Sequence, residues 1–244
     1  MRILVKIGGK ILENQNDLFF TINQLRTLVL KKKILNKVII ITGGGSYANF
    51  IRLIDKKLNI GDDLAHWEAI LAMDWNSIKL HTHFPEIPLF LQLSELSDYL
   101  KKNSKERQML IFQSFSFLYK EDVLPHSWKV TSDSIAIHIA SKLGLEKCFL
   151  IKDIDGILDN NNKLIKELTI KQYREFKKAK KIAEIPSKFQ NFKKETPIDS
   201  YSLKLLKKNK MQFIILNGSQ PNSRIIQYFT LHSNRDKIYT KISY

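Results

Sequence analysis

The stretch VIIITGGGSYANFIR, residues 38–52, runs a β-favouring apolar segment directly into three consecutive glycines. One interpretation is a turn that requires positive φ at several positions. The other is a loop without Cβ atoms, whose N–H groups approach an anion while the next helix points its N-terminus at that anion. Because a turn rarely requires three glycines, the sequence favours a loop in which the backbone of Gly43, Gly44 and Gly45 closely approaches an anion.

Four other apolar runs resemble the one before these glycines, and none of them alternates with polar residues. Unbroken apolar runs are typical of strands covered on both faces, and segments with helical spacing separate them. The sequence therefore predicts an α/β protein with a mainly parallel sheet. The expected strands are 3–5, 38–41, 109–112, 148–151 and 213–216, and the expected helix faces are Leu18, Ile22, Leu25 and Val29; Leu64, Trp67, Leu71 and Ile78; and Ile135, Ile139 and Leu143.

Length and composition favour one large domain or two lobes, since 244 residues with 43% hydrophobic residues can bury a substantial core. The single cysteine, Cys148, lies in an apolar run and cannot form an internal disulfide, which favours a reducing compartment. We find neither a signal-peptide pattern nor an apolar stretch as long as a membrane span. We therefore expect a soluble, cytoplasmic protein with no membrane partner.

The formal net charge of +16 raises the possibility of a nucleic-acid partner. The lysines, however, occur in short groups such as LKKK (30–33) and LLKKNK (205–210), and the chain is also rich in Ile and Asn. We interpret the charge as background composition together with attraction of anionic substrates, and do not expect a nucleic-acid partner. The lysine-rich segment 177–197, with two prolines, is predicted to be a mobile lid or an excursion from the fold.

Unusual residues follow the predicted strands, where ligands of parallel sheets bind. These segments are KIGGK (6–10), GGGS (43–46), KDIDG (152–156) and NGSQPNSR (217–224). A Walker-type phosphate loop is absent from the sequence. Gly43, Gly45 and Ala48 match a dinucleotide fingerprint, but Asp62 and Asp63, at the required distance, follow no strand-like run. The sequence therefore disfavours a dinucleotide-binding enzyme.

Phosphoryl transfer depends on positioned cations and N–H donors around the transferring group. Lys6 lies between buried residues and the pair Gly8–Gly9, so we expect it to reach such a group. Thr131 or Ser132 is expected to cap a helix that carries Asp133 in its first turn. A carboxylate near a phosphate site could also hold lysine ammonium groups in place.

Six segments occur in the order seen in the amino acid kinase superfamily, which the chain resembles over nearly its full length. They are VKIGGK, ITGGGS, TSDSIAIHIASKLG, LIKDIDGIL, PIDSYSLKLLKKNK and FIILNGSQPNSR. Within that superfamily, LAHWEAILAMD and WKVTSDSIA are most similar to archaeal kinases that phosphorylate an aminomethylfuran phosphate to its diphosphate. The C-terminal part is also similar to uridylate kinase.

The resemblance implies a three-layer αβα sandwich, assembled as a homo-oligomer. Residues 1–127 would bind the acceptor, and residues 128–244 would bind ATP with Mg²⁺, without metal ligands from the protein. The implied roles are catalysis for Lys6 and Asp133; phosphate binding for Gly8, Gly9, Lys10, Gly43, Gly44 and Gly45; and nucleotide binding for Thr131, Ser132, Lys152, Asp153, Asp155 and Gly156. The chain departs from the family at Lys10, where many members have Ser, and at Tyr239, which replaces the Gly of a closing G-T-x-I motif.

Acceptor binding is expected from the helices that follow the glycine loop. Helical spacing puts Arg52 and His66 within reach of the same strand ends. Arg offers a planar fork suited to a phosphate or carboxylate, and Trp67 could supply a flat wall for a ring such as furan or uracil. The alternatives are core packing for Trp67, and for Arg52 a surface ion pair with Asp55 or Asp63.

Two functions follow from these observations. The first is an ATP-dependent kinase acting on a small phosphorylated or carboxylated acceptor. A phosphate acceptor would already be ionised and would need no general base. The second is a non-catalytic regulatory protein on the same fold, which binds nucleotide or nucleic acid through its basic surface.

Overall fold

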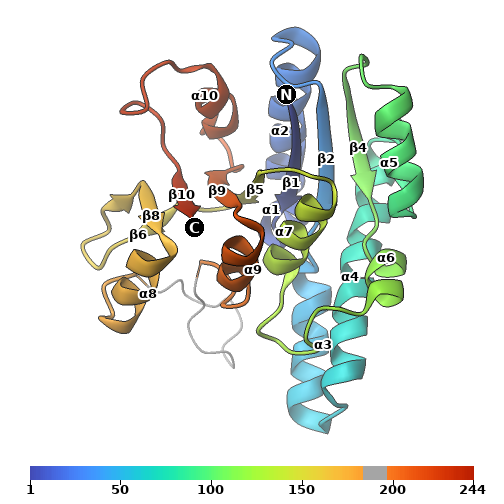
Figure 1. Ribbon diagram of the computed structural model, residues 1–244, viewed down its shortest axis with the longest axis vertical. Helices are drawn as coiled ribbons and strands as arrows, with labels where there is room; N and C mark the ends of the chain where they lie inside the picture. Colours follow the sequence, from blue (N-terminus) through green and yellow to red (C-terminus); the bar gives the residue numbers. More distant parts are fainter. Residues whose placement is uncertain (184–196) are drawn as a thin grey trace.

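The computed structural model describes residues 1–183 and 197–244 (Figure 1). An eight-stranded sheet runs through it in the order β3-β4-β2-β1-β5-β9-β10-β8, and β6 pairs with β7 in a separate hairpin. Within the eight-stranded sheet, β10 is antiparallel to β9 and the other pairs are parallel. The strands are β1 (Arg2–Ile7), β2 (Lys37–Thr42), β3 (Leu89–Phe90), β4 (Gln108–Phe112), β5 (Lys147–Lys152), β6 (Ile157–Leu158), β7 (Leu164–Ile165), β8 (Glu167–Thr169), β9 (Gln212–Asn217) and β10 (Thr240–Ser243).

The five predicted strands are confirmed as β1, β2, β4, β5 and β9, each slightly longer than its apolar run. Their side chains enter two cores on opposite faces of the sheet. Leu4 of β1 packs in the core that contains α7 and α9, whereas its neighbour Val5 packs in the core that contains α2 and α10. This arrangement confirms the α/β fold with helices on both faces of a mainly parallel sheet.

The helices alternate with the strands, as the sequence predicts. They are α1 (Gly9–Glu13), α2 (Gln15–Arg26), the π-helical turn η1 (Thr27–Lys31), α3 (Gly45–Leu58), α4 (Asp62–His83), α5 (Leu93–Lys102), α6 (Phe115–Glu121), α7 (Ser132–Lys142), α8 (Ile170–Lys178), α9 (Ser202–Asn209) and α10 (Arg224–Thr230). None of the helices in the described part of the chain is both long enough and apolar enough to cross a membrane.

The predicted face of α4 is wrong, although the helix itself is confirmed. Leu64, Leu71 and Ile78 are exposed by 50%, 47% and 45%, while Ile70 and Met73 are buried. Apolar residues occur all around this helix, so periodicity alone does not identify the side that meets the sheet. Contact with the sheet decides which side faces inward. The backbone carbonyl of Met73 accepts a hydrogen bond of 2.6 Å from Thr42 at the end of β2.

Part of the predicted lid, segment 177–197, lies outside the described residues, namely 184–196. Described residues of the segment lie on both sides of that gap. Lys177 is in the last turn of α8, and the backbone carbonyl of Pro197 accepts a hydrogen bond of 2.7 Å from Lys152 at the end of β5.

Candidate active site

A cavity of about 480 Å³ opens at the carboxyl ends of β1 and β2, opposite the N-terminus of α7. Two of its walls differ in construction. The glycine wall consists of Gly9, Gly44 and Gly45, at the starts of α1 and α3. The polar wall consists of Thr131, Asp133 and Asp199, at the start of α7 and in the turn before α9.

The glycine wall is made of two strand-end loops in direct contact. A Cβ atom on Gly9 would lie 2.4 Å from Cα of Gly45, and a Cβ atom on Gly44 would lie 2.5 Å from Cβ of Ala48. Gly45 has φ of +57°, which also favours glycine. The loops therefore require glycine because they approach each other, and at Gly9, Gly44 and Gly45 the lining of the cavity is backbone.

Gly8 and Gly43, also expected at the phosphate, are placed differently. Neither is among the residues that line the cavity. Their N–H groups donate to the carbonyls of Ile151 and Ile7, at 2.8 Å in each case, which continues the hydrogen bonding between neighbouring strands. These two glycines connect the strands to the wall.

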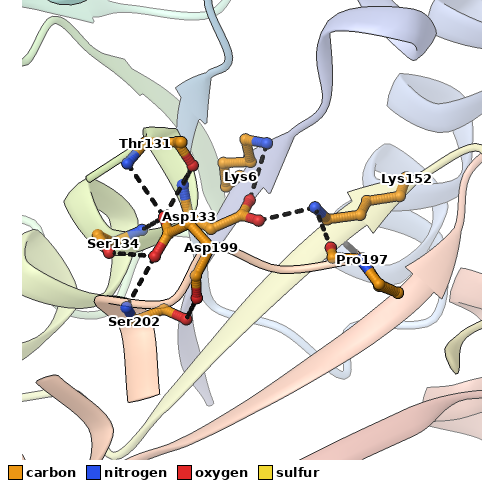
Figure 2. A network of polar contacts seen from close by, with 8 residues as sticks. All are labelled: Lys6, Thr131, Asp133, Ser134, Lys152, Pro197, Asp199 and Ser202. Carbon is orange, nitrogen blue, oxygen red and sulfur yellow. Dashed lines mark hydrogen bonds and ion pairs between the residues drawn. The ribbon is translucent and has the colours of Figure 1, made fainter. Parts of the chain in front are cut away.

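Lys6 and Lys152 converge on Asp133 in the polar network of Figure 2. The Lys6 ammonium lies 2.9 Å from Oδ1 of Asp133, and the Lys152 ammonium lies 2.7 Å from Oδ2. Lys6 and Asp133 are 5% and 3% exposed, so neither charge is solvated. The structure thus brings together one carboxylate and two cations from β1, β5 and α7, all lining the cavity.

The charges of this network depend on one another. Burial acts to raise the pKa of Asp133, but the ammonium groups of Lys152 and Lys6 outweigh it and lower that pKa to about 2. Burial lowers the pKa of Lys6, and Asp133 opposes that shift. Asp133 is therefore ionised at neutral pH, and its charge holds the two lysines side by side.

Asp199 is a functional candidate that the sequence did not reveal. Its carboxylate accepts hydrogen bonds from the backbone N–H and hydroxyl of Thr131, from the backbone N–H and hydroxyl of Ser134, and from the backbone N–H of Ser202, at 2.6–3.1 Å. It therefore joins the starts of α7 and α9 (Figure 2). The one available signal was its position three residues before Ser202 at a helix start, which is typical of a cap.

Thr131 is confirmed as the N-cap of α7, and Ser132 is the first residue of that helix. The Thr131 hydroxyl accepts from the backbone N–H of Asp133 while donating to Asp199. Both Thr131 and Ser132 line the cavity. The cap therefore fixes the turn from which Asp133 projects.

The residues that follow β5 lie outside this cavity, at its edge. Asp153 forms an ion pair of 3.0 Å with Lys10, which does line the cavity. Asp155 accepts hydrogen bonds from Asn217 and Arg224, at 3.1 and 3.2 Å. These contacts connect the β5 end to α1, β9 and α10.

Gly156 has φ of +147°, and a Cβ atom there would lie 2.4 Å from the hydroxyl oxygen of Thr240. That hydroxyl accepts from the N–H of Ile157 and donates to the carbonyl of Ile165. Thr240, which with Ile242 is retained from the closing G-T-x-I motif, thus attaches the β6–β7 hairpin to the sheet. Tyr239 beside it is buried and its hydroxyl donates to Glu167.

At the acceptor end, Arg52 and His66 line the cavity but Trp67 does not. Trp67 packs edge-on against Tyr119, with ring centroids 5.0 Å apart, which matches the core-packing alternative. Burial and the neighbouring His126 lower the pKa of His66 to about 4. His66 is thus neutral at neutral pH and can offer an acceptor a hydrogen bond but no charge.

Trp128 supplies the aromatic side chain of the cavity that was expected from Trp67. The Arg52 guanidinium carbon lies 4.5 Å from the centroid of the Trp128 ring, and the indole N–H donates to Asp55 at 2.7 Å. Asp63, the other carboxylate considered for Arg52, pairs with His126 at 2.6 Å. Periodicity did not single out Trp128 because it precedes α7 in an irregular segment.

Comparison with known proteins agrees with the order of the motifs. The model of the Amino acid kinase family matches residues 1–217. The (5-(aminomethyl)furan-3-yl)methyl phosphate kinase of Methanocaldococcus jannaschii is 29% identical over 241 residues, which cover 98% of this chain and 96% of that protein. The acetylglutamate kinase of Agrobacterium fabrum is 33% identical over 106 residues, which cover 43% of this chain and 32% of that protein.

Solved structures show the same fold. A UMP kinase from Ureaplasma parvum superimposes with a TM-score of 0.64 at 20% identity, covering 100% of this chain and 96% of that one. A uridylate kinase from Archaeoglobus fulgidus superimposes with a TM-score of 0.66 at 16% identity, covering 100% of both chains. The predicted αβα architecture is thereby confirmed.

Proposed function

Since the chain belongs to the amino acid kinase family and is an enzyme of the kinase class, we propose that it transfers the γ-phosphoryl group of ATP to a small phosphomonoester. The first candidate acceptor is aminomethylfuran phosphate, with its diphosphate as the product, because the similar archaeal kinase matches nearly the whole chain. The observation that carries the proposal is the pair of lysines held by Asp133 in a cavity whose lining also includes Gly9, Gly44 and Gly45.

The reaction forms a bond from an acceptor phosphate oxygen to the γ-phosphorus, and breaks the bond from that phosphorus to the oxygen of ADP. The acceptor oxygen already carries negative charge, so no proton has to be removed. Lys6 and Lys152 would neutralise charge on the transferring group, and the glycine wall would offer N–H groups. Asp133 would keep both ammonium groups in place during transfer.

Mg²⁺ would be held mainly by the phosphates of ATP and would supply further charge neutralisation. Among the described residues there is no group of three or more His, Cys, Asp or Glu side chains that could hold a metal ion. Both oxygens of Asp133 already contact lysines. Mg²⁺ commonly keeps several waters and binds through substrate phosphates, so this donor set fits ATP carrying the ion.

The proposed division of labour follows the sheet. Strands from residues 1–127 lie on one side of it and strands from residues 128–244 on the other, with β1 beside β5 at the boundary. We assign acceptor binding to the first part, with Arg52 as its anion-binding group. We assign ATP to the second part, with Thr131, Ser132 and Lys152 nearest to its phosphates.

Homo-oligomer assembly is part of the proposal. Helix α3 has no buried residue, and together α3 and α4 expose large apolar side chains. These are Tyr47, Phe50, Leu58, Leu64, Leu71, Trp75 and Ile78. An apolar surface of this kind is typical of an interface between protein chains. We place the enzyme in the cytoplasm, where the thiol of Cys148 stays reduced.

The test is an ATP-consumption screen with Mg²⁺ and three acceptors: aminomethylfuran phosphate, UMP and N-acetylglutamate. We expect turnover with a phosphomonoester, seen by ³¹P NMR as a new diphosphate. Arg52→Lys should weaken use of that acceptor by about 1–3 kcal/mol, the scale of a lost charged hydrogen bond, and leave ATP affinity unchanged. Binding of ATP without turnover of any acceptor, by a folded protein, would support the non-catalytic alternative.

A further inference from the structure

Three residues from two distant segments form a stack at the acceptor end of the cavity. The guanidinium carbon of Arg52 lies over the Trp128 ring, 4.5 Å from its centroid. The indole N–H at the edge of that ring donates to Asp55 at 2.7 Å. Arg52 and Asp55 are three residues apart on α3, so they share one side of the helix. The indole therefore lies along α3, in contact with both.

This stack restricts an otherwise adaptable side chain. Arginine carries several rotatable bonds, and α3 has no buried residue that would confine Arg52 by core packing. A guanidinium stacked on an aromatic face keeps its plane fixed, and its N–H groups point outward around the edge of that plane, which is the geometry that binds an anion. Trp128 thus supplies a flat support, and both residues line the cavity.

The segment that carries Trp128 is attached to the neighbouring helix as well. His126 contacts Asp63 and Asp122 at 2.6 and 2.7 Å, and its ring stacks on His66 with centroids 4.4 Å apart. The same segment continues into α7 at Thr131. It therefore connects the α3 and α4 surface to the turn that bears the catalytic carboxylate Asp133.

We propose that Trp128 is the positioning residue of the acceptor site: held by Asp55, it presents Arg52 to the phosphate of a small phosphomonoester. This inference rests on the proposed function, because it assigns the acceptor to Arg52. It extends that function by making the stack of Arg52, Trp128 and Asp55 the unit that sets acceptor affinity. Its loss is therefore expected to change the affinity for the acceptor and not the affinity for ATP.

The first experiment separates the ring face from the N–H group. Trp128→Leu removes both and should raise the acceptor KM about tenfold or more, with the ATP KM unchanged. Trp128→Phe keeps the aromatic face, so most of the affinity should return. Asp55→Ala should raise the acceptor KM less than Trp128→Leu does. The double variant Asp55→Ala, Trp128→Phe should have the same acceptor KM as Trp128→Phe alone, because each substitution removes the same hydrogen bond.

Tyr244 provides the matched control, since it is an exposed aromatic residue outside both the cavity and the apolar surface of α3 and α4. Tyr244→Leu should leave both KM values unchanged. A lower melting temperature of Trp128→Leu with equal effects on ATP and acceptor would show a structural role and overturn the inference. Additive effects of Asp55→Ala and Trp128→Phe would also contradict it.

A binding measurement without turnover distinguishes this inference from the proposed function. The probes are aminomethylfuran phosphate, UMP and inorganic phosphate, added without ATP, with titration calorimetry as the readout. Wild type and Tyr244→Leu should bind a phosphate probe with the same Kd, whereas Trp128→Leu and Arg52→Lys should bind it more weakly. If the wild type turns over no acceptor but keeps this pattern, the proposed function fails and the inference stands. If acceptor is turned over but Trp128→Leu binds the probes as tightly as the wild type does, the inference fails alone.

Discussion

The glycine wall and the polar wall face the same cavity but achieve their form by opposite means. Gly9 and Gly45 are in backbone contact, and a Cβ atom added to Gly9 would lie 2.4 Å from Cα of Gly45. The polar wall consists of side chains, with the carboxylates of Asp133 and Asp199 each accepting several hydrogen bonds. One wall has no room for an added atom, and the other depends on every partner being present.

Substitutions in the two walls are therefore expected to impair the protein for different physical reasons. Substitutions in the glycine wall should act through steric overlap and should be insensitive to charge. Substitutions in the polar wall should act through unpaired charges and unmatched donors, which cost most when they are buried. A charge-dependent effect in the glycine wall, or a purely steric effect in the polar wall, would contradict this distinction.

The largest expected effect is that of Lys6→Ala. A cation that meets the transferring phosphoryl acts mainly in the transition state, so kcat should fall by about 10²–10³ while KM changes little. Lys37→Ala is the matched control, because Lys37 is equally buried but lies at the opposite end of the neighbouring strand β2. Steady-state kinetics on both variants, with melting temperatures, decide the matter. An unchanged kcat in folded Lys6→Ala would remove Lys6 from the chemistry.

Asp199→Ala should lower the unfolding free energy of the protein by about 3 kcal/mol, because it leaves several hydrogen-bond donors at the starts of α7 and α9 without an acceptor. Asp199→Asn keeps one acceptor oxygen and should recover part of that loss. Because Thr131 caps the turn that carries Asp133, kcat should fall in parallel with stability across the two variants. Urea unfolding with kinetics tests this, and full activity in Asp199→Ala would refute the coupling.

Gly9→Ala should destabilise the protein by about 2 kcal/mol, the scale of overpacking, and should also reduce turnover. The control is Gly144→Ala. Gly144 has φ of +66°, but a Cβ atom there would meet nothing within 4 Å. That variant should lose stability through its backbone conformation alone and keep its kcat. Loss of turnover in both variants would show that the glycine wall acts only through general stability.

The smallest expected effect is on the unfolding free energy at low pH. The pKa of Asp133 is lowered from 3.8 to about 2, so its contribution to stability is complete above pH 3.8. That contribution, up to about 2 kcal/mol, is lost as pH falls through the folded-state value. Comparing unfolding free energies of wild type and Asp133→Asn between pH 6 and pH 2 tests the sign. The difference between the two should shrink as pH falls, and a constant difference would contradict it.

The glycine wall was predictable because its signal is local. Gly9 and Gly45 follow the apolar runs of β1 and β2, and these strands are neighbours in the sheet. Lys6 and Asp133 were also accessible, because a lysine before a double glycine and a carboxylate in the first turn of a helix are unusual in themselves. In these cases the residue and its reason lie within a few positions of each other.

Asp199 and Trp128 were missed because their partners are distant in the sequence. The donors to Asp199 include Thr131 and Ser134, and Trp128 acts through Asp55 and Arg52. Each lies in an irregular segment without periodicity. The inward face of α4 was mispredicted for a related reason, since contact with β2 decides that face. These features depend on contacts between segments that are distant in the sequence, and local sequence patterns do not reveal such contacts.

The central claim is that phosphoryl transfer takes place between the glycine wall and the lysines held by Asp133. The most direct test is a crystal structure with Mg²⁺ and a non-hydrolysable ATP analogue. We predict a γ-phosphate within hydrogen-bonding distance of the Lys6 ammonium and of N–H groups from the glycine wall. A γ-phosphate bound away from both, with Lys6 still paired only to Asp133, would contradict the account.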